Sequence, residues 1–584
     1  MGVKRSKGSK AATVSTTAEQ DGAADVNEGA PARKSLPVPL LAVLAVALAV
    51  RLWGISWGLP SALHYFSYHP DETAVLFYST IQMNAFAGKL LPGFYNYGSL
   101  QLYLVEFANC LGYLFNAVNI VIHDFSKDYD SWARMTLIGR LLTVTMGVWT
   151  VGLTYGIGTR LWNARAGLLA AALLAVMPLH AQHSHWLTVD VPATFWITLS
   201  LYWSTRLLQA REAGVDSLGL WQRVKPAVHA GLTAGFATAT KYNAALVILP
   251  ILYAALPVKR DAPSIRQTLT WSILALVAFA LAFLIGCPGS LLQSNAFIAG
   301  VAFEARHVSA QADLPFQQTG SGFVFHIANN LFYGMGWPLL LIALASVVYA
   351  AVRRERQDGL LAVFALPYYV LIGLAVVRYA RYTIPLLPFL ALWSGRMLDD
   401  LLASTKSTVR QAGVALTAVA LLATAGFCLY FIAPMAGVDP RDRAVDWLNA
   451  HGYDTQPVGF ACMPWFQSPP IDPAFGDLGH GGWIGFPTHP PNWQTRIDFH
   501  GKDWDMSILN VDKPPVIVLS QYDYKDAIRV HQTPALAFLS KLQTDYRVAA
   551  EFGGYGKAEI GPSGPAYDMM YPNPAIWIFV RKGP

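Results

Sequence analysis

The chain has 584 residues, of which 54% are hydrophobic and 13% are charged, and its mean hydropathy is +0.35. Soluble globular domains average about 25% charged residues, so this composition excludes an ordinary soluble protein and predicts a polytopic membrane protein. The formal charge of +6 comes mostly from Lys and Arg in short loops between apolar runs, which argues against a nucleic-acid partner. Four scattered cysteines without a short-spaced pair support neither a zinc site nor a disulfide framework.

Residues 1–35 are small and polar, and they cannot bury enough apolar surface to offset the entropy of ordering. We predict a disordered cytoplasmic tail there, followed by a first membrane span over 36–57 that stays as an anchor. Ten further spans are predicted from apolar runs. They cover 134–158, 166–182, 189–208, 227–240, 243–257, 268–286, 324–351, 360–377, 381–398 and 411–433.

The loop charges set the expected orientation. Eleven spans with the N-terminus inside place the basic clusters, such as 353–356, in cytoplasmic loops and leave the outer loops poor in Lys and Arg. The segment 98–121 is apolar but contains Glu106 and Asn109, and a twelfth crossing there would invert this pattern. We therefore predict that it lies at the outer interface. The fold class expected is a polytopic α-helical membrane protein with a first outer loop over 58–133.

That first loop contains Tyr68-His69-Pro70-Asp71-Glu72. Two carboxylates beside a membrane span are costly to keep, so they indicate chemistry at the bilayer surface. Pro70 is expected to end an extended stretch, and 73–87 is expected to form an amphipathic helix along the membrane. The alternative is that Asp71 only caps this helix, and the two roles are compatible.

Further polar residues collect on the same predicted side of the membrane. Asp190 starts the fourth span, after His180, His183 and His185, and its alternative role is that of a helix N-terminal carboxylate. The histidines suit either a metal or interface packing. The cations on this side are Lys241, Arg378 and Arg381, and Tyr382 is adjacent to Arg381. Each cation alone could snorkel to the headgroups, but cations facing carboxylates describe a site for an anionic lipid headgroup beside a general base.

The character changes after Pro434, where the sequence becomes rich in Pro, Gly, Asp and Trp. Short β-type runs occur at 516–519 and 576–580, and helices are expected around 441–449 and 533–542. We predict a transmembrane catalytic domain over 36–435 and an extracytoplasmic α/β domain over 436–584.

Six parts of the sequence carry a family resemblance: Tyr68 to Glu72, Tyr95 to Leu100, Arg160 to Trp162, Ser184 to Asp190, Lys241, and Arg381 to Pro388. Together they resemble the GT-C class of integral-membrane glycosyltransferases, in particular the protein O-mannosyltransferases and the lipid A aminoarabinose transferases. The resemblance covers roughly 36–433. A Trp-Trp-Asp-Tyr-Gly run, which the oligosaccharyltransferases carry, and a Pro-Pro pair after the first loop are missing, and this lowers the expectation of a protein acceptor.

The resemblance implies an inverting transfer of a hexose or pentose from a polyprenyl-phosphate carrier to a cell-envelope glycan, lipid or protein, at the outer face of the plasma membrane. It implies catalytic roles for Asp71, Glu72 and Asp190, and donor-phosphate binding by Lys241, Arg378, Arg381 and Tyr382. His69, Tyr97 and His185 are the expected substrate contacts. No cofactor is certain, and a divalent cation near Asp71, Glu72 and His69 stays open.

Two functions of other classes remain. A transporter or flippase for a lipid-linked glycan would also hold polar groups in a membrane cavity, although such proteins often show paired repeats, whereas here the polar residues collect on one face. A membrane protein that only binds glycan through 437–584 would leave the embedded carboxylates unexplained.

Overall fold

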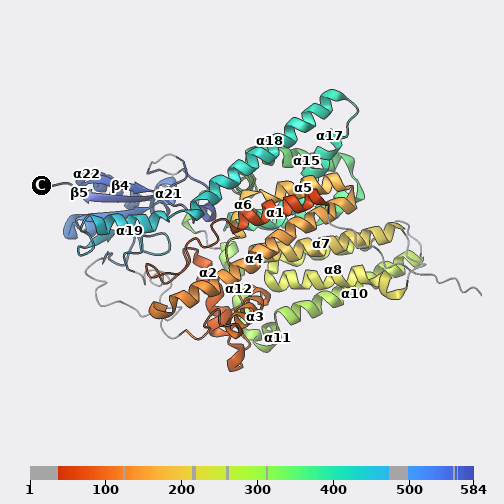
Figure 1. Ribbon diagram of the computed structural model, residues 1–584, viewed down its shortest axis with the longest axis horizontal. Helices are drawn as coiled ribbons and strands as arrows, with labels where there is room; N and C mark the ends of the chain where they lie inside the picture. Colours follow the sequence, from red (N-terminus) through yellow and green to blue (C-terminus); the bar gives the residue numbers. More distant parts are fainter. Residues whose placement is uncertain are drawn as a thin grey trace, which may run out of the picture.

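The computed structural model describes residues 37–122, 125–213, 219–257, 262–310, 313–472, 497–556, 560–561 and 563–583. The predicted tail over 1–35 lies outside these residues. Helices make up most of the chain up to residue 436, and a mixed β-sheet follows (Figure 1). In Figure 1 the sheet, in blue, lies at one end of the elongated helical bundle.

Long helices form the bundle where the sequence has its apolar runs. Backbone N–H and C=O groups in lipid must pair within their own segment, so such runs fold as helices. The main bundle helices are α1 (Val38–Leu52), α4 (Phe125–Leu161), α5 (Ala164–Ala175), α7 (Asp190–Ala213), α8 (Leu220–Thr240), α9 (Ile248–Ala255), α10 (Ala262–Gly286), α15 (Trp337–Arg353), α16 (Arg356–Leu374), α17 (Leu387–Leu402) and α18 (Ser407–Ile432). Every predicted span overlaps at least one of them.

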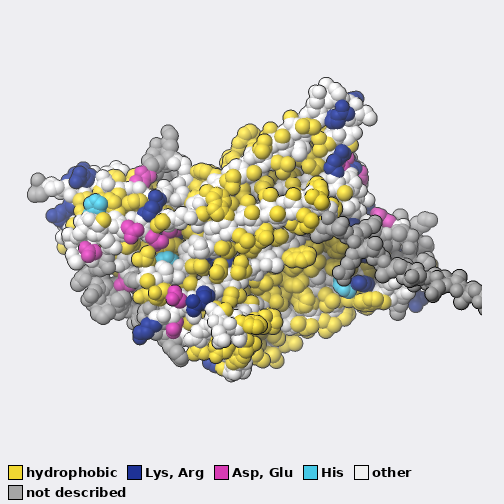
Figure 2. Space-filling view, viewed as in Figure 1, with side chains coloured by type: hydrophobic (Ala, Val, Ile, Leu, Met, Phe, Trp, Pro, Cys, Tyr) yellow, Lys and Arg dark blue, Asp and Glu magenta, His cyan; other side chains and the backbone are white. Residues whose placement is uncertain are grey.

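Four helical stretches of the described chain are long and apolar enough to cross a membrane by length and composition: Lys127–Leu161, Ala262–Gly286, Arg356–Leu374 and Ser407–Ala450. Figure 2 shows a broad apolar surface over the bundle, with Lys and Arg gathered at the end away from the sheet and charges of both signs around the sheet. The chain is therefore an integral membrane protein, while the count of eleven crossings and the side of the N-terminus stay predictions.

The bundle is packed tightly through small residues. Gly231 and Gly235, one turn apart on α8, face α10 so closely that a Cβ would lie 2.2 Å from the carbonyl oxygen of Ala275 and 2.3 Å from that of Phe279. Small residues at this spacing let two helices approach closely, and dispersion contacts then hold them together where no hydrophobic driving force exists. The seam between α8 and α10 fixes the end of α8, where Lys241 follows.

The first loop departs from the prediction. The helix expected over 73–87 is wrong in extent, because α2 (Pro70–Leu76) is only seven residues long and a π-helical turn, Phe77–Gln82, follows it. The chain then becomes extended at Met83, and the Asn84 side chain accepts the N–H of Ala87 at 3.0 Å. Asn and Ser side chains compete in this way for backbone groups, which disfavours a continuous helix.

The remaining α-helices before residue 337 are α3 (Leu100–Leu114), α6 (Pro178–His183), α11 (Gly289–Leu292), α12 (Ser294–Ala310), α13 (Gly322–Phe325) and α14 (Phe332–Met335). In Figure 1, α3, α11 and α12 lie with α2 in the lower part of the view, whereas α6 lies beside α1. The segment 98–121 thus contains a helix, as expected, and its interfacial position stays a prediction.

The C-terminal part contains a five-stranded sheet in the order β2-β1-β3-β5-β4. The strands are β1 (Val458–Phe460), β2 (Ile497–Asp498), β3 (Val516–Ser520), β4 (Tyr546–Phe552) and β5 (Ile576–Arg581), with helices α19 (Pro440–Ala450), α21 (Gln521–Arg529) and α22 (Thr533–Asp545). β1 is parallel to β2 and β3, whereas β5 is antiparallel to β3 and β4. The two strands and two helices predicted here are confirmed, and the domain boundary and the side of the membrane stay predictions.

The sheet region is tied to the first loop. Trp57 donates its indole N–H to Asp439 Oδ2 at 2.9 Å, and the Arg441 guanidinium lies 3.8 Å from the centre of the Tyr68 ring. One hydrophobic cluster contains Trp57, Tyr68 and Trp186 together with strand residues such as Val458. The C-terminal part therefore packs directly on the loop that carries Asp71.

Candidate functional site

The two acidic residues of the first loop occupy the start of α2. His69 is the N-cap, and its Nδ1 accepts the backbone N–H of Asp71 at 3.2 Å. Pro70 takes the first helical position, where the missing N–H costs nothing. Asp71 is thus in the first turn rather than at the cap, and its side chain keeps 27% of its surface exposed.

Glu72 is sealed in a different environment. Arg140 of α4 donates two hydrogen bonds to its carboxylate, at 2.8 and 2.7 Å, and Leu187 N–H donates a third at 2.7 Å. The Ser67 hydroxyl is also hydrogen-bonded to it, and both ionic side chains are fully buried. Burial alone would raise the pKa of Glu72, but the Arg140 guanidinium outweighs burial and holds the pKa below its ordinary value. These contacts make Glu72 an internal tie between the loop, α4 and the turn before α7.

Asp71 instead faces the chain between α16 and α17. Arg381 lies in the 3-10 helix η6 (Ala380–Leu386), and its Nη2 is 3.4 Å from Asp71 Oδ2. Its Nη1 is 3.6 Å from Oδ2 of Asp568, a residue of the C-terminal part whose side chain is fully buried. The Tyr379 ring stacks against the guanidinium at 3.8 Å. One arginine therefore links a partly exposed carboxylate to a buried one.

A second ion pair lies beside the first. Lys241 follows α8 and places Nζ 2.6 Å from Oδ1 of Asp190, the first residue of α7. The same Nζ is 4.9 Å from the centre of the Tyr382 ring, and Tyr382 is adjacent to Arg381 in η6. We call Asp71, Asp190, Lys241, Arg381 and Asp568 the charged cluster.

Lys241 of the charged cluster lines a cavity of about 420 Å³, together with Tyr382, the neighbour of Arg381. Its polar lining includes Tyr97, Lys241, Glu304 and Tyr382, and its apolar lining includes Val301, Val308, Leu371 and Leu374. Leu374 is 71% exposed on the bundle surface. Burial raises the pKa of Glu304 above its ordinary value even though Lys241 opposes this. The cavity thus has one charged, hydrogen-bonding end and one apolar side.

The close approach of one loop to α8 shapes the polar end. Gly98 lies so near the end of α8 that a Cβ there would be 2.0 Å from the carbonyl oxygen of Ala239. The Tyr242 hydroxyl donates to the carbonyl oxygen of Tyr97 at 2.8 Å. Burial raises the pKa of the Tyr97 phenol well above its usual range, so it enters the cavity as a neutral hydrogen-bonding group.

Three predicted site residues lie in other surroundings. Arg378 donates to Thr319 Oγ1 at 2.6 Å and to the carbonyl oxygen of Gly320 at 2.8 Å, so it binds a neighbouring loop. The ring nitrogens of His185 contact backbone carbonyl oxygens of Ala181 and Trp53, at 2.9 and 3.1 Å.

His69 is fully buried, with its ring 4.5 Å from that of Trp186. Its Nε2 has no hydrogen-bond partner among the described residues. Because Nδ1 accepts a backbone N–H, the neutral ring carries its proton on this unpaired Nε2. His69 therefore supports the start of α2. The substrate-binding roles of His69 and His185 and the donor-phosphate role of Arg378 stay predictions.

Sequence reasoning missed Asp568, Glu304 and Arg140. A charged residue inside an apolar run needs a partner, and this signal applied to Arg140, which lies within the predicted span 134–158. Glu304 lies in the second half of α12, directly after the apolar run 296–303. Asp568 lies in an aperiodic stretch far along the chain, and no local pattern marks it.

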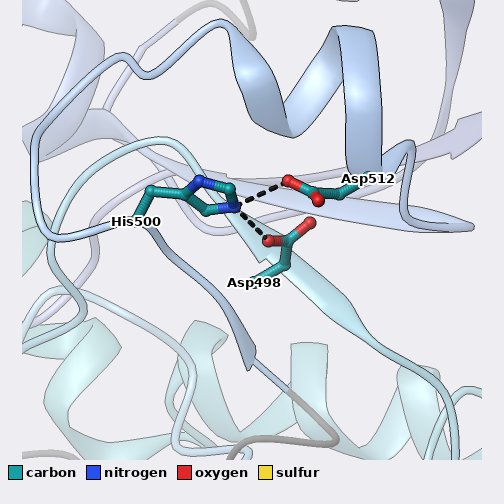
Figure 3. A group of neighbouring side chains, drawn as sticks. All are labelled: Asp498, His500 and Asp512. Atoms are coloured by element: carbon teal, nitrogen blue, oxygen red, sulfur yellow. Dashed lines mark hydrogen bonds and ion pairs between the residues drawn. The ribbon is translucent and has the colours of Figure 1, made fainter.

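The structure also bears on the open question of a divalent cation. Glu72 spends its oxygens on Arg140, Ser67 and Leu187, so it does not form a shared ligand set with Asp71 and His69. Within the described chain, one group of three has metal-ligand spacing: Asp498, His500 and Asp512, at the edge of the C-terminal sheet (Figure 3). His500 Nε2 lies 3.0 Å from Asp498 Oδ1 and 2.6 Å from Asp512 Oδ2, so these three side chains already pair with one another.

Part of the sequence matches a known protein family. Residues 136–285 match the family described as dolichyl-phosphate-mannose-protein mannosyltransferase. No curated protein matches the chain. Among solved structures, the ArnT protein from Cupriavidus metallidurans bound to undecaprenyl phosphate is 15% identical, with 92% of this chain and 97% of that chain covered at a TM-score of 0.49.

The archaeal oligosaccharyltransferase AglB from Archaeoglobus fulgidus, in complex with an inhibitory peptide and a dolichol-phosphate, is 14% identical, with 88% and 72% covered at a TM-score of 0.49. At these TM-scores the superpositions support no statement on function. The family match, which spans α4 to α10 and includes Asp190 and Lys241, confirms the predicted resemblance of this chain to the GT-C glycosyltransferases of the protein O-mannosyltransferase branch.

Proposed function

We propose that this protein is an inverting glycosyltransferase that moves a sugar from a polyprenyl-phosphate carrier to an acceptor hydroxyl at the outer face of the plasma membrane. Asp71 is the general base, and Lys241 and Arg381 hold the carrier phosphate. The observation that carries the proposal is the charged cluster itself. Residues from four distant parts of the chain bring two carboxylate–cation pairs together beside one cavity with a polar end and an apolar side.

The cavity fits the two halves of such a donor. A prenyl chain is apolar and arrives by lateral diffusion, so it needs an apolar groove that is reachable from lipid. Leu371 and Leu374 supply exposed apolar surface of this kind on α16. A phosphate needs cations in a water-poor site, and Lys241 is one such group, with only 12% of its side chain exposed.

The step balances as a displacement at the anomeric carbon. Asp71 takes the proton of the acceptor hydroxyl, the acceptor oxygen forms a bond to the anomeric carbon, and the bond from that carbon to the phosphate oxygen breaks. The electron pair leaves with the polyprenyl phosphate, whose charge Lys241 and Arg381 stabilise. Attack from the face opposite the leaving group inverts the anomeric configuration.

Asp71 has the environment that a base needs. It is partly exposed, and its ion pair with Arg381 is long, at 3.4 Å, so an oxygen stays accessible to an incoming hydroxyl. Asp190 pairs with Lys241 at 2.6 Å, and we assign it the role of orienting that ammonium. Glu72 is assigned no step, because its carboxylate is fully engaged.

The test uses purified full-length protein in nanodiscs with polyprenyl-phosphate mannose, and it follows release of polyprenyl phosphate over a panel of hydroxyl acceptors. We expect Asp71→Asn to lower transfer by about 10²–10⁴-fold, the usual worth of a positioned base. Asp545→Asn, a partly exposed carboxylate at the end of α22 that pairs with Lys541, is the matched control and should keep full activity. Transfer by Asp71→Asn within threefold of the parent protein would remove Asp71 from this role.

A further inference from the structure

The C-terminal part contributes a side chain to the charged cluster. Asp568 lies in a 3-10 turn, Tyr567–Met569, and is fully buried. Its Oδ1 accepts the backbone N–H of Ala380 and its Oδ2 accepts that of Arg381, both at 2.9 Å. The first N–H groups of a helix have no partner within it, so a carboxylate there satisfies them and favours the helix start. Asp568 therefore fixes where η6 begins.

The same carboxylate also faces the side chain that η6 carries. Oδ2 of Asp568 is 3.6 Å from Nη1 of Arg381, and the other guanidinium nitrogen, Nη2, is 3.4 Å from Asp71. Nη1 is buried and has no hydrogen-bond partner among the described residues. Arg381 is thus held between two negative charges and keeps one buried donor unspent. A guanidinium poised in this way can donate to an oxygen of a ligand without giving up its anchor.

His183 also lies near Asp568, and Tyr571 follows Asp568 by three residues. His183 Nε2 is 3.9 Å from Oδ2 of Asp568, and burial lowers the pKa of His183 to about 4, so this histidine is neutral near pH 7 and supplies no competing positive charge. Tyr571 contributes an aromatic wall, with its ring 4.8 Å from that of His69. Arg381 is therefore the cation paired with Asp568 here.

We propose that Asp568 is a positioning residue for Arg381, so that the transfer site of the membrane bundle is completed by a side chain from the C-terminal part. This inference rests on the proposed function. Asp568 competes with Asp71 for the guanidinium. Without its charge, Arg381 pairs with Asp71 alone, which occupies the base and removes the cation from the departing phosphate. The first loop, η6 and the segment around Asp568 then work as one unit.

The experiment measures kcat and donor KM for Asp568→Asn in the full-length protein. We expect kcat to fall at least tenfold, donor KM to stay within threefold because Lys241 is untouched, and the thermal unfolding midpoint to change by no more than a few degrees. In the double variant with Arg381→Ala, the Asp568 change should add less than a twofold further loss, since both act through the same guanidinium. Asp545→Asn again serves as the matched control.

Two outcomes would overturn the inference: an unchanged kcat in Asp568→Asn, or losses that multiply in the double variant. If Asp568→Asn does not fold, Asp568→Glu keeps the charge and displaces it by one methylene, and its kcat should still fall while KM holds. An unchanged kcat in Asp568→Glu would also contradict the positioning role of Asp568.

Failure of the proposed function can be distinguished from failure of this inference by an assay of the parent protein. If the parent protein transfers no sugar from any polyprenyl-phosphate donor, the proposed function fails. Hydrogen exchange of the Ala380 and Arg381 amides then still tests the anchor, because these amides should exchange faster in Asp568→Asn than in the parent protein.

Discussion

The Glu72–Arg140 pair and the Asp71–Arg381 pair start from adjacent residues and lie in opposite surroundings. Glu72 has every oxygen engaged, at 2.8 Å or less from its partners, and is fully enclosed. Asp71 has a long ion pair with Arg381 and an exposed fraction of 27%, and Tyr382, which follows Arg381, lines the cavity. Adjacent acids in a sequence therefore need not share a task. Enclosure and saturated hydrogen bonding suit a structural ion pair, whereas partial exposure beside an unpaired donor suits the base that we propose.

The sharpest way to break this comparison is to neutralise Glu72. We expect Glu72→Gln to lower the free energy of unfolding by about 3–5 kcal/mol, because it leaves the Arg140 charge buried without a counterion. Asp71→Asn, which removes a partly exposed pair, should cost less than about 1 kcal/mol. Thermal unfolding of both variants in detergent decides the matter. Equal losses of stability would show that the two pairs do not differ in kind.

A substitution of Lys241 tests whether the cavity beside the charged cluster binds phosphate. We expect Lys241→Met to weaken binding of undecaprenyl phosphate by roughly 10- to 100-fold, because a hydrogen bond to a charged group contributes about 1.5–3 kcal/mol. Lys225→Met is the matched control, since Lys225 lies on α8, the helix that Lys241 follows, near Trp203 and does not line the cavity. Binding is measured by native mass spectrometry or by ligand-induced thermal shift. An equal effect of both variants would contradict the assignment.

Two buried histidines, His64 and His183, lead us to expect that stability depends on pH. Burial lowers the pKa of His64 and of His183 to about 4, against an unfolded value of 6.5. Between about pH 6.5 and pH 4 these histidines are protonated in the unfolded chain but neutral in the folded chain. The free energy of unfolding therefore falls as the pH drops below about 6.5. Each histidine should cost about 1–2 kcal/mol by pH 5.

The measurement compares thermal unfolding at pH 7 and pH 5. His64→Phe, which keeps a ring to stack on Tyr68, should flatten the dependence. An identical dependence in His64→Phe and the parent protein would show that His64 already accepts a proton in the folded state.

Much of the bundle was predictable because an apolar run in lipid has few alternatives to a helix. The run at 268–286, for example, coincides with most of α10. The first loop was harder, because amphipathic spacing over 73–87 suggested one helix, while local hydrogen bonding at Asn84 ended it early. Local side-chain competition of that kind is invisible to a count of apolar positions.

In the charged cluster, Asp71, Asp190, Lys241 and Arg381 were all predicted as site residues. Each is a charge beside a predicted span on one side of the membrane, and the cost of such charges is a strong signal. Asp568 could not be found in this way, since it follows Arg381 by 187 residues and lies in an aperiodic stretch with prolines on both sides, far from any predicted span. Only packing of the C-terminal part against the bundle brings it there.

Gly98 has a practical consequence for redesign. With no room for even a methyl group between this residue and the end of α8, the stretch that carries Tyr97 and the stretch that carries Lys241 form one rigid joint. A chimera that imports another loop at 94–99 must bring glycine to this place, or it will push Lys241 off Asp190. Substitutions on the apolar side of the cavity, at Val301 or Val308, lie away from this close contact and leave the packing of Gly98 against α8 unchanged.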